Sequence, residues 1–388
     1  MQPNKKLIPR RLIEIIKTKL FRNKAIIIYG PRQVGKTTLV NSILTELEVD
    51  DSSYSGKTIY LNGDDSDVRE ILSKPNIVKL DGIIGKAKIL FIDEAQRIPD
   101  IGLIIKIIVD RIKDVQVIAT GSSSFLLSQS IKEPLTGRAF EFVLYPLTFG
   151  ELVAHSSLLN EKRKIENRLI YGSYPEIAVS PGEEKDLLAL LSGSYLYRDL
   201  FILETVSRPE LLEKITKAIA FQVGSEVSTV EIGQLVSADR ITVEKYIDLL
   251  ERAFIIFKLP ALNRNVRNEI KKGKKIYFYD NGIRNAVIKN FNPFNSRNDV
   301  GALWENYCIS ERVKYLAYAK SDVHGYFWRT TQQQEIDYVE ESANNISAYE
   351  LKFNPLSKAK FSKTFINSYP VKFTKVITPD NIEEFIYQ

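Results

Sequence analysis

The sequence predicts an α/β protein built on a parallel β-sheet, followed by further domains. A chain of 388 residues exceeds what one hydrophobic core normally holds. After residue 23, short apolar runs alternate regularly with helical stretches. The apolar runs lie at residues 25–29, 58–61, 89–92 and 115–119, and the helical stretches lie near 36–47, 66–74 and 101–112. Runs that are apolar throughout are typical of strands buried on both faces, as in a parallel sheet with crossover helices.

Composition excludes several classes of protein. Hydrophobic residues make up 44% and charged residues 26% of the chain, which is the balance of an ordinary globular protein. The single cysteine, Cys308, cannot form an internal disulfide, and two histidines leave little room for a histidine-based zinc site or a serine-type triad. No apolar run is long enough to span a bilayer, and the N-terminus lacks the apolar core of a signal peptide. We therefore expect a cytoplasmic protein without a membrane partner.

Residues 30–37 match the phosphate-loop pattern G-x-x-x-x-G-K-[ST] at every defined position. The motif follows the first predicted strand and opens a predicted helix, so backbone N–H groups and the helix N-terminus can surround phosphate oxygens. We expect Lys36 to reach the β- and γ-phosphates of ATP, and the Thr37 hydroxyl to ligate Mg²⁺. The expected nucleotide contacts are Gly30, Pro31, Arg32, Gln33, Val34, Gly35, Lys36, Thr37 and Thr38.

Two acidic residues follow the third predicted strand. Four apolar residues deliver Asp93 to the carboxyl end of that strand, where it can hold the metal ion. Glu94 is then placed to polarise the attacking water. A helix N-cap at Asp93 is the structural alternative. The next strand ends in hydroxyls, and Thr120 or Ser122 either senses the γ-phosphate or caps the following helix.

Residues 21–150 resemble the AAA-type ATPases of the prokaryotic group related to origin-recognition ATPases. The resemblance is carried by Gly-Pro-Arg-Gln-Val-Gly-Lys-Thr-Thr at 30–38 and by Leu-Thr-Gly-Arg-Ala-Phe-Glu-Phe-Val-Leu-Tyr-Pro-Leu-Thr-Phe-Gly-Glu at 135–151. It makes Arg138 a candidate arginine finger or γ-phosphate sensor, acting on its own nucleotide or on that of a neighbouring subunit. Only the second case implies a homo-oligomer. A surface ion pair is the alternative role for Arg138.

The same resemblance implies a domain order, because in that group the ATPase is followed by a winged helix and a PD-(D/E)XK nuclease fold. The expected domains are an AAA-type P-loop domain at 1–147, a helical lid at 148–207, a winged helix at 208–290 and a restriction-endonuclease-like α/β domain at 291–388.

Positive charge is concentrated in the middle of the chain. The net charge of the whole chain is +6, and residues 236–290 alone hold twelve basic and six acidic residues. Two helical patterns followed by a hairpin with a lysine-rich tip resemble a winged helix. Carboxylates on the second helix oppose a DNA duplex, so we expect contacts mainly between the hairpin and phosphates. The expected nucleic-acid contacts are Lys271, Lys272, Lys274 and Lys275. A solvated lysine-rich loop, or packing against a protein, is the alternative.

Two predicted strands near the C-terminus carry charged residues. A strand period of two puts Glu350 and Lys352 on one face, and Asp337 on the neighbouring strand meets them if the register allows. Asp337 and Glu350 would hold Mg²⁺, while Lys352 orients the water or stabilises developing phosphate charge. The spacing resembles that of PD-(D/E)XK nucleases, and Glu305 corresponds to the helix carboxylate of that fold. A solvated strand face is the alternative.

The sequence therefore predicts a Mg²⁺-dependent ATPase whose hydrolysis is coupled to nucleic-acid binding or processing, with DNA as the expected partner. The alternative is an ATP-controlled switch or scaffold that binds a protein partner, with an inactive nuclease-like domain. DNA that accelerates ATP turnover would separate the two.

Overall fold

The computed structural model describes residues 7–121, 134–195, 208–263 and 273–387, apart from the single positions 331, 344 and 358. The chain divides into two compact units, one formed by Arg10–Tyr145 and the other by Pro146–Gln388 together with Met1–Pro9. Three residues with predicted roles, Ser122, Lys271 and Lys272, lie outside the described residues. Within the described part of the chain, no helix is long and apolar enough to cross a membrane.

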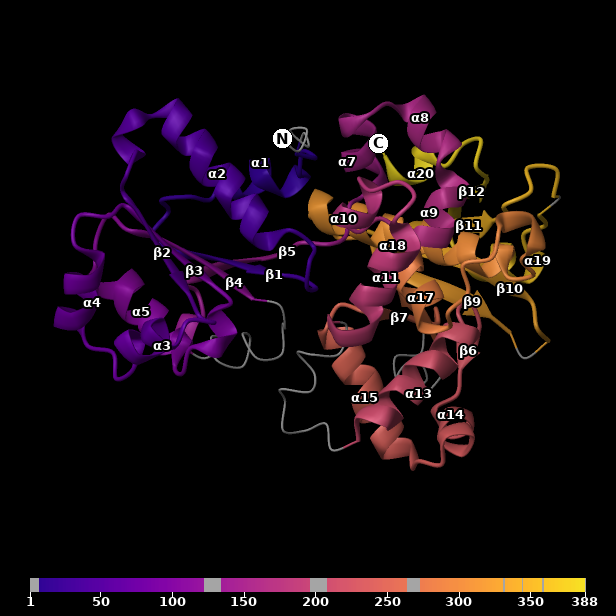
Figure 1. Ribbon diagram of the computed structural model, residues 1–388. Helices are drawn as coiled ribbons and strands as arrows, with labels where there is room; N and C mark the ends of the chain where they lie inside the picture. Colours follow the sequence, from indigo (N-terminus) through magenta and orange to yellow (C-terminus); the bar gives the residue numbers. More distant parts are fainter. Residues whose placement is uncertain are drawn as a thin grey trace. The chain divides into compact units, whose positions relative to one another are not determined.

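A five-stranded parallel sheet forms the centre of the unit Arg10–Tyr145 (Figure 1). Its strands are β1 (Ala25–Tyr29), β2 (Thr58–Asn62), β3 (Ile89–Asp93), β4 (Gln116–Gly121) and β5 (Ala139–Val143). Their order in the sheet is β2-β3-β4-β1-β5. The strands β1, β3 and β4 are buried along their whole length. The predicted α/β fold with a buried parallel sheet is therefore confirmed, and β4 separates the phosphate-loop strand from the strand that ends in Asp93.

Helices cover both faces of this sheet. They are α1 (Arg11–Lys17), α2 (Lys36–Asp50), α3 (Ser66–Leu72), α4 (Ile77–Ile84) and α5 (Ile101–Arg111). Figure 1 shows α1 and α2 above the sheet and α3, α4 and α5 below it. Ile101, Ile104, Ile105 and Ile108 of α5 are fully buried, and their spacing of three and four residues forms the apolar stripe that packs on the sheet.

The second unit begins with a run of helices, as the sequence predicts. These are α7 (Phe149–His155), α8 (Leu158–Arg163), α9 (Ile165–Tyr171), α10 (Pro175–Ala178) and α11 (Glu184–Leu190). Thr148 and Glu151 form a capping box at the start of α7, which explains why the helix begins there. A helical turn at Leu191–Tyr195 ends this described stretch.

Three helices and a small antiparallel sheet follow. The helices are α13 (Pro209–Phe221), α14 (Thr229–Val236) and α15 (Arg240–Arg252). The strands β6 (Glu226–Val227), β7 (Ile256–Pro260) and β8 (Lys274–Phe278) are ordered β6-β8-β7. The predicted pair of helices followed by a hairpin is thus present, and α17 (Asn281–Val287) comes after it.

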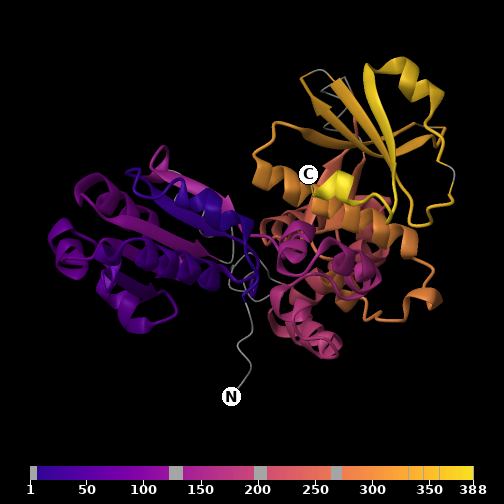
Figure 2. The same ribbon diagram turned by 90° about the horizontal axis from the view of Figure 1, so that it is seen from above.

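The C-terminal region combines the long helix α18 (Val300–Ala319) with a four-stranded sheet (Figure 2). Its strands are β9 (His324–Arg329), β10 (Glu335–Ser342), β11 (Asn345–Leu351) and β12 (Val371–Ile377), in the order β12-β11-β10-β9. The short helices α19 (Lys363–Ser368) and α20 (Glu383–Ile386) complete it. The two predicted strands that carry Asp337 and Glu350 are confirmed as β10 and β11.

The basic hairpin is attached to this C-terminal sheet. Ala261, just beyond β7, forms a parallel bridge with Phe327, and the Leu262 N–H donates to the Phe327 carbonyl over 2.7 Å. Leu262 is buried in the same apolar cluster as Trp328 and Ile336. The start of the loop that follows β7 is therefore fixed to β9. The predicted division of this unit into lid, winged-helix and nuclease-like domains stays a prediction.

Candidate functional site

The phosphate loop lies between β1 and α2 and depends on two glycines. Gly30 has a φ of +154°, and a Cβ there would come within 2.3 Å of the Leu144 carbonyl oxygen. Gly35 has a φ of +92° and caps α2. The Lys36 side chain is buried, and its ammonium donates to the carbonyls of Gly30 and Pro31 over 2.9 Å each. The loop thus holds its lysine at the N-terminus of a helix, where anions are favoured.

Asp93 accepts hydrogen bonds from hydroxyl groups of three other elements. It ends β3, is 5% exposed, and accepts hydrogen bonds from the Thr37 hydroxyl at 2.7 Å and the Tyr60 hydroxyl at 3.3 Å. The Thr120 hydroxyl, at the end of β4, donates to the second oxygen, which also accepts from the Glu94 N–H at 3.2 Å. The strand order explains this arrangement, because β4 places Thr120 beside Asp93.

These side chains fit the Mg²⁺ ion that the sequence implies. A threonine hydroxyl and a carboxylate are hard oxygen ligands of the kind that Mg²⁺ prefers. Thr37 and Asp93 are already hydrogen-bonded to each other, although 56 positions separate them in the chain. The structure therefore brings together the two residues predicted as metal ligands beside Lys36.

Tyr60 is a residue of this site that the sequence did not indicate. Partial burial, and then the negative charge of Asp93, raise the pKa of Tyr60 to about 12. The hydroxyl therefore stays protonated at neutral pH and donates a hydrogen bond to Asp93. The available signal was its position on β2, two residues before Asn62, which pairs with Asp93 in the neighbouring strand.

Glu94 follows Asp93 in a tight left-handed turn. Its φ is +47°, and a side chain at Gly63 would come within 2.4 Å of the Glu94 carbonyl oxygen. The Gln96 amide donates to the Glu94 carboxylate over 2.5 Å. The turn keeps the candidate base next to Asp93, with Gln96 fixing its orientation.

Arg138 lies beside the edge strand β5, at the opposite end of the strands from the phosphate loop. It precedes β5, and its carbonyl accepts from the N–H of Ala25, the first residue of β1. The phosphate loop follows the other end of β1, and five residues of strand span roughly 16 Å. The Arg138 guanidinium pairs with Asp110 over 2.7 Å and is 38% exposed. The surface ion pair is therefore present, and Arg138 lies at the opposite end of β1 from the phosphate loop.

The predicted C-terminal residues meet across two strands. Tyr338 pairs with Tyr349 in the antiparallel register, which brings Asp337 opposite Glu350. The Lys352 ammonium lies 3.0 Å from Asp337 and 2.8 Å from Glu350. Among the residues that the structure describes, no group of three or more His, Cys, Asp or Glu side chains is arranged to hold a metal ion.

Burial, and then the charge of Asp337, raise the pKa of Glu350 to about 7. Folded Glu350 thus keeps its proton between pH 4.5 and about 7, where the unfolded chain has lost it. The free energy of unfolding should therefore fall across this range, by on the order of 2 kcal/mol from this group. Urea unfolding at pH 5 and at pH 8 measures this difference in the free energy of unfolding. In Glu350→Gln the difference should be smaller by the contribution of this group. The exposed Glu213→Gln is the control, and equal pH dependence in all three proteins would contradict the assignment.

Lys275 was predicted to contact DNA, and its burial contradicts that prediction. It is 1% exposed, and its ammonium pairs with Glu305 over 2.9 Å and with Glu335 over 2.5 Å. The Tyr277 hydroxyl donates to the same Glu305 oxygen over 2.6 Å. Lys275 is therefore unavailable to phosphates, because strand alternation turns it into the protein. Glu305, the counterpart of the helix carboxylate in the nuclease-like fold, thus pairs with Lys275 and Tyr277, and burial together with the nearby charge of Asp337 raises its pKa.

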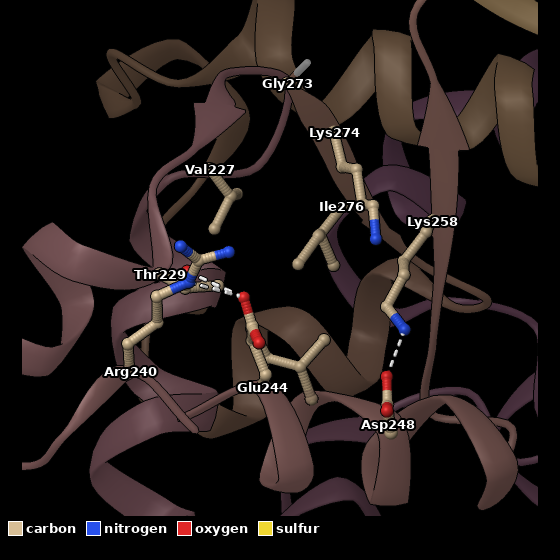
Figure 3. A pocket seen from close by; sticks show the side chains of 10 residues that line it. Val227, Thr229, Arg240, Glu244, Asp248, Lys258, Gly273, Lys274 and Ile276 are labelled. Atoms are coloured by element: carbon tan, nitrogen blue, oxygen red, sulfur yellow. Dashed lines mark hydrogen bonds and ion pairs between the residues drawn. The ribbon is translucent and has the colours of Figure 1, made fainter. Parts of the chain in front are cut away.

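A polar pocket of about 380 Å³ lies between α15 and the hairpin strands (Figure 3). On its walls Arg240 pairs with Glu244 over 2.8 Å, and Lys258 pairs with Asp248 over 2.5 Å. Lys274, which also lines the pocket, is exposed. Over residues 226–263 and 273–278 together, six acidic residues balance six basic ones. The charge excess of the hairpin therefore comes from residues 264–272, outside the described part.

Comparisons with known proteins divide the chain into three matched regions. Residues 22–153 match an AAA domain, and residues 162–293 and 300–384 match two domains of unknown function, DUF8612 and DUF4143. An uncharacterized protein of Mycobacterium tuberculosis is 25% identical over 343 residues, which cover 87% of this chain and 72% of that protein. An uncharacterized protein of Haemophilus influenzae is 24% identical over 253 residues, covering 62% of this chain and 60% of that protein.

A solved structure shares the fold. The Walker-type ATPase of Pyrococcus abyssi aligns with a TM-score of 0.50 and 16% identity, covering 74% of this chain and 97% of that one. The predicted AAA-type P-loop domain is confirmed by the domain match and by the parallel sheet. The chain thus carries a P-loop AAA domain at residues 22–153, followed by two domains of unknown function.

Proposed function

We propose that this chain is a Mg²⁺-dependent ATPase. The observation that carries the proposal is the cluster of Lys36, Thr37 and Asp93, joined by the hydrogen bond between Thr37 and Asp93. The loop N–H groups and Lys36 bind the phosphates, and Thr37 and Asp93 hold the metal. Mg²⁺, when bound, neutralises charge on the phosphates. Glu94 accepts a proton from the attacking water or orients it.

The experiment that tests this function is steady-state ATP hydrolysis by the full chain with Mg²⁺, measured with and without duplex DNA at low salt. Turnover that requires Mg²⁺ supports the proposal, and a chain that neither binds nor hydrolyses ATP overturns it. Stimulation by DNA supports coupling to nucleic acid, whereas indifference to DNA supports a protein partner.

DNA is the first candidate for the coupled partner, because the excess of basic residues in the hairpin falls at its tip. Replacing Lys271, Lys272 and Lys274 together by Gln should weaken DNA binding and lower its salt dependence. The slope of log K against log[salt] should fall by roughly 0.9 for each lost contact with duplex phosphates. Fluorescence anisotropy over a salt series measures the slope, with Lys214→Gln on the exposed face of α13 as the control. An unaltered slope would place the contacts elsewhere.

A protein partner is the second candidate, and two features favour it. The described part of the middle segment carries balanced charge, with the carboxylates of α15 facing the pocket. Large apolar side chains are also exposed beside the turn between α14 and α15, where Leu235 is 72% exposed and Ile241 is 78% exposed. Apolar side chains suit a protein surface better than a phosphate backbone.

Arg138 leads to a prediction about assembly, since it lies at the opposite end of β1 from the phosphate loop of its own subunit. If Arg138 acts on a neighbouring subunit, Arg138→Ala and Lys36→Ala should each be inactive alone and regain part of the turnover when mixed. Mixed neighbours then combine one intact phosphate loop with one intact arginine. Arg111→Ala, an exposed arginine next to Asp110, is the control. Normal turnover by Arg138→Ala alone would limit Arg138 to its surface ion pair.

Phosphodiester cleavage at Asp337, Glu350 and Lys352 stays a prediction. Their proximity supports it. The bridging position of Lys352 is also what a structural ion pair between two strands requires. Cleavage of the DNA used above that disappears in Lys352→Ala, with ATP turnover unchanged, is the result that supports it.

A further inference from the structure

Arg10 is a buried arginine that touches the phosphate loop from outside the matched AAA domain. It precedes α1 and is 9% exposed. Its guanidinium donates to two main-chain carbonyls, that of Val34 over 3.0 Å and that of Tyr145 over 2.5 Å. Val34 belongs to the phosphate loop, and the planar guanidinium has the geometry to hold two acceptors at once. Arg10 therefore joins the loop to a residue 135 positions away in the chain.

The two residues joined by this hydrogen bond are the first and last residues of the P-loop unit. Arg10 is its first residue and Tyr145 its last, so the chain enters and leaves the P-loop unit at this hydrogen-bonded pair. The single guanidinium thus ties the phosphate loop to both places where the backbone crosses between the units.

Residues 144–146, where the chain leaves the P-loop unit, form the exit segment. This segment also contacts the beginning of the phosphate loop. The Leu144 N–H donates to the Tyr29 carbonyl over 2.8 Å, and the Leu144 carbonyl oxygen lies where a Cβ on Gly30 would be 2.3 Å away. The residues that leave the sheet are consequently held at both ends of the loop, by the bond to Tyr29 next to Gly30 and through Arg10 at Val34.

The phosphate binding proposed above should change the hydrogen bonds within this loop. The Lys36 ammonium is bonded to the carbonyls of Gly30 and Pro31. Phosphate oxygens compete for that ammonium, because charge-assisted hydrogen bonds to them are stronger than those to neutral carbonyls. Arg10 bonds to a different carbonyl, so it keeps its hold on the loop while Lys36 changes partners. A shift of the loop is then passed to the exit segment.

We propose that Arg10 is a positioning residue that couples nucleotide occupancy of the phosphate loop to the backbone at Tyr145–Pro146. The proposal rests on the nucleotide binding proposed above. By linkage, the same coupling makes the affinity for nucleotide depend on the state of the exit segment.

Hydrogen exchange of the full chain tests the coupling. The reporter is the peptide spanning residues 139–150, which contains the Leu144 amide. In the unaltered chain, Mg²⁺ and a non-hydrolysable ATP analogue should change exchange at this amide about fivefold or more. Arg10→Gln should still bind the analogue, with affinity reduced up to about tenfold, but should lose the exchange response. Arg22→Gln, an exposed arginine of the same unit, should respond like the unaltered chain.

Each result has a separate meaning. An unaltered chain that binds no analogue overturns the proposed nucleotide function itself. Binding without a change in exchange, or an unchanged response in Arg10→Gln, overturns the coupling. Arg10→Lys is the second variant if circular dichroism shows that Arg10→Gln is unfolded. It keeps the charge but cannot bridge two carbonyls in the same way, so loss of the response supports the coupling and retention overturns it.

Discussion

Lys36→Ala should reduce ATP hydrolysis by a factor of about a hundred to a thousand, the usual effect of removing one charge-stabilising donor from an active site. The reason lies in the position of the ammonium. It is buried at the start of α2 and bonded to two carbonyls of the loop that would surround the phosphates. Replacement by alanine removes this donor from the carbonyls of Gly30 and Pro31.

The measurement is steady-state release of phosphate, together with binding of a fluorescent ATP analogue. Lys86→Ala is the control, because this exposed lysine belongs to the same unit. Both signals should fall in Lys36→Ala and stay unchanged in Lys86→Ala. Undiminished turnover in Lys36→Ala would remove the nucleotide assignment of residues 30–37.

The sequence could predict the phosphate site because its signals are local. Gly30 and Gly35 are required by the backbone of one short loop, and that loop is read directly from consecutive residues. The strands β1, β3 and β4 each contain a continuous apolar run, so their burial was predictable too. The edge strands β5 and β12 escaped prediction, since their half-exposed residues do not form continuous apolar runs.

The contacts of Tyr60 and Lys275 with distant segments could not be predicted from the sequence. Tyr60 reaches Asp93 only because β2 lies beside β3 in the sheet. Lys275 looks like any lysine of a basic run, and only the packing of β8 against α18 and β10 shows that it is buried between Glu305 and Glu335. Local charge patterns cannot distinguish a lysine that faces solvent from its neighbour on the other face of the strand.

Glu94→Gln should retain ATP binding but slow hydrolysis by a factor of about a hundred to ten thousand, the range over which a positioned general base contributes. The substitution keeps the size and shape of the side chain while removing its ability to accept a proton. The amide oxygen can still accept the hydrogen bond from Gln96, and the left-handed backbone at this position is unchanged. Asp93 keeps its bonds to Thr37 and Thr120, so the residues expected to hold the metal stay in place.

This separation of binding from turnover distinguishes Glu94 from Lys36, whose loss should lower both. The analogue-binding assay and phosphate release are measured on the same preparation, with the exposed Glu70→Gln as the matched control. Normal hydrolysis by Glu94→Gln would show that another group activates the water. Loss of binding as well as turnover would instead mean that the turn after β3 supports the phosphate loop. Slow turnover with intact binding is the combination expected of a residue that acts on the attacking water.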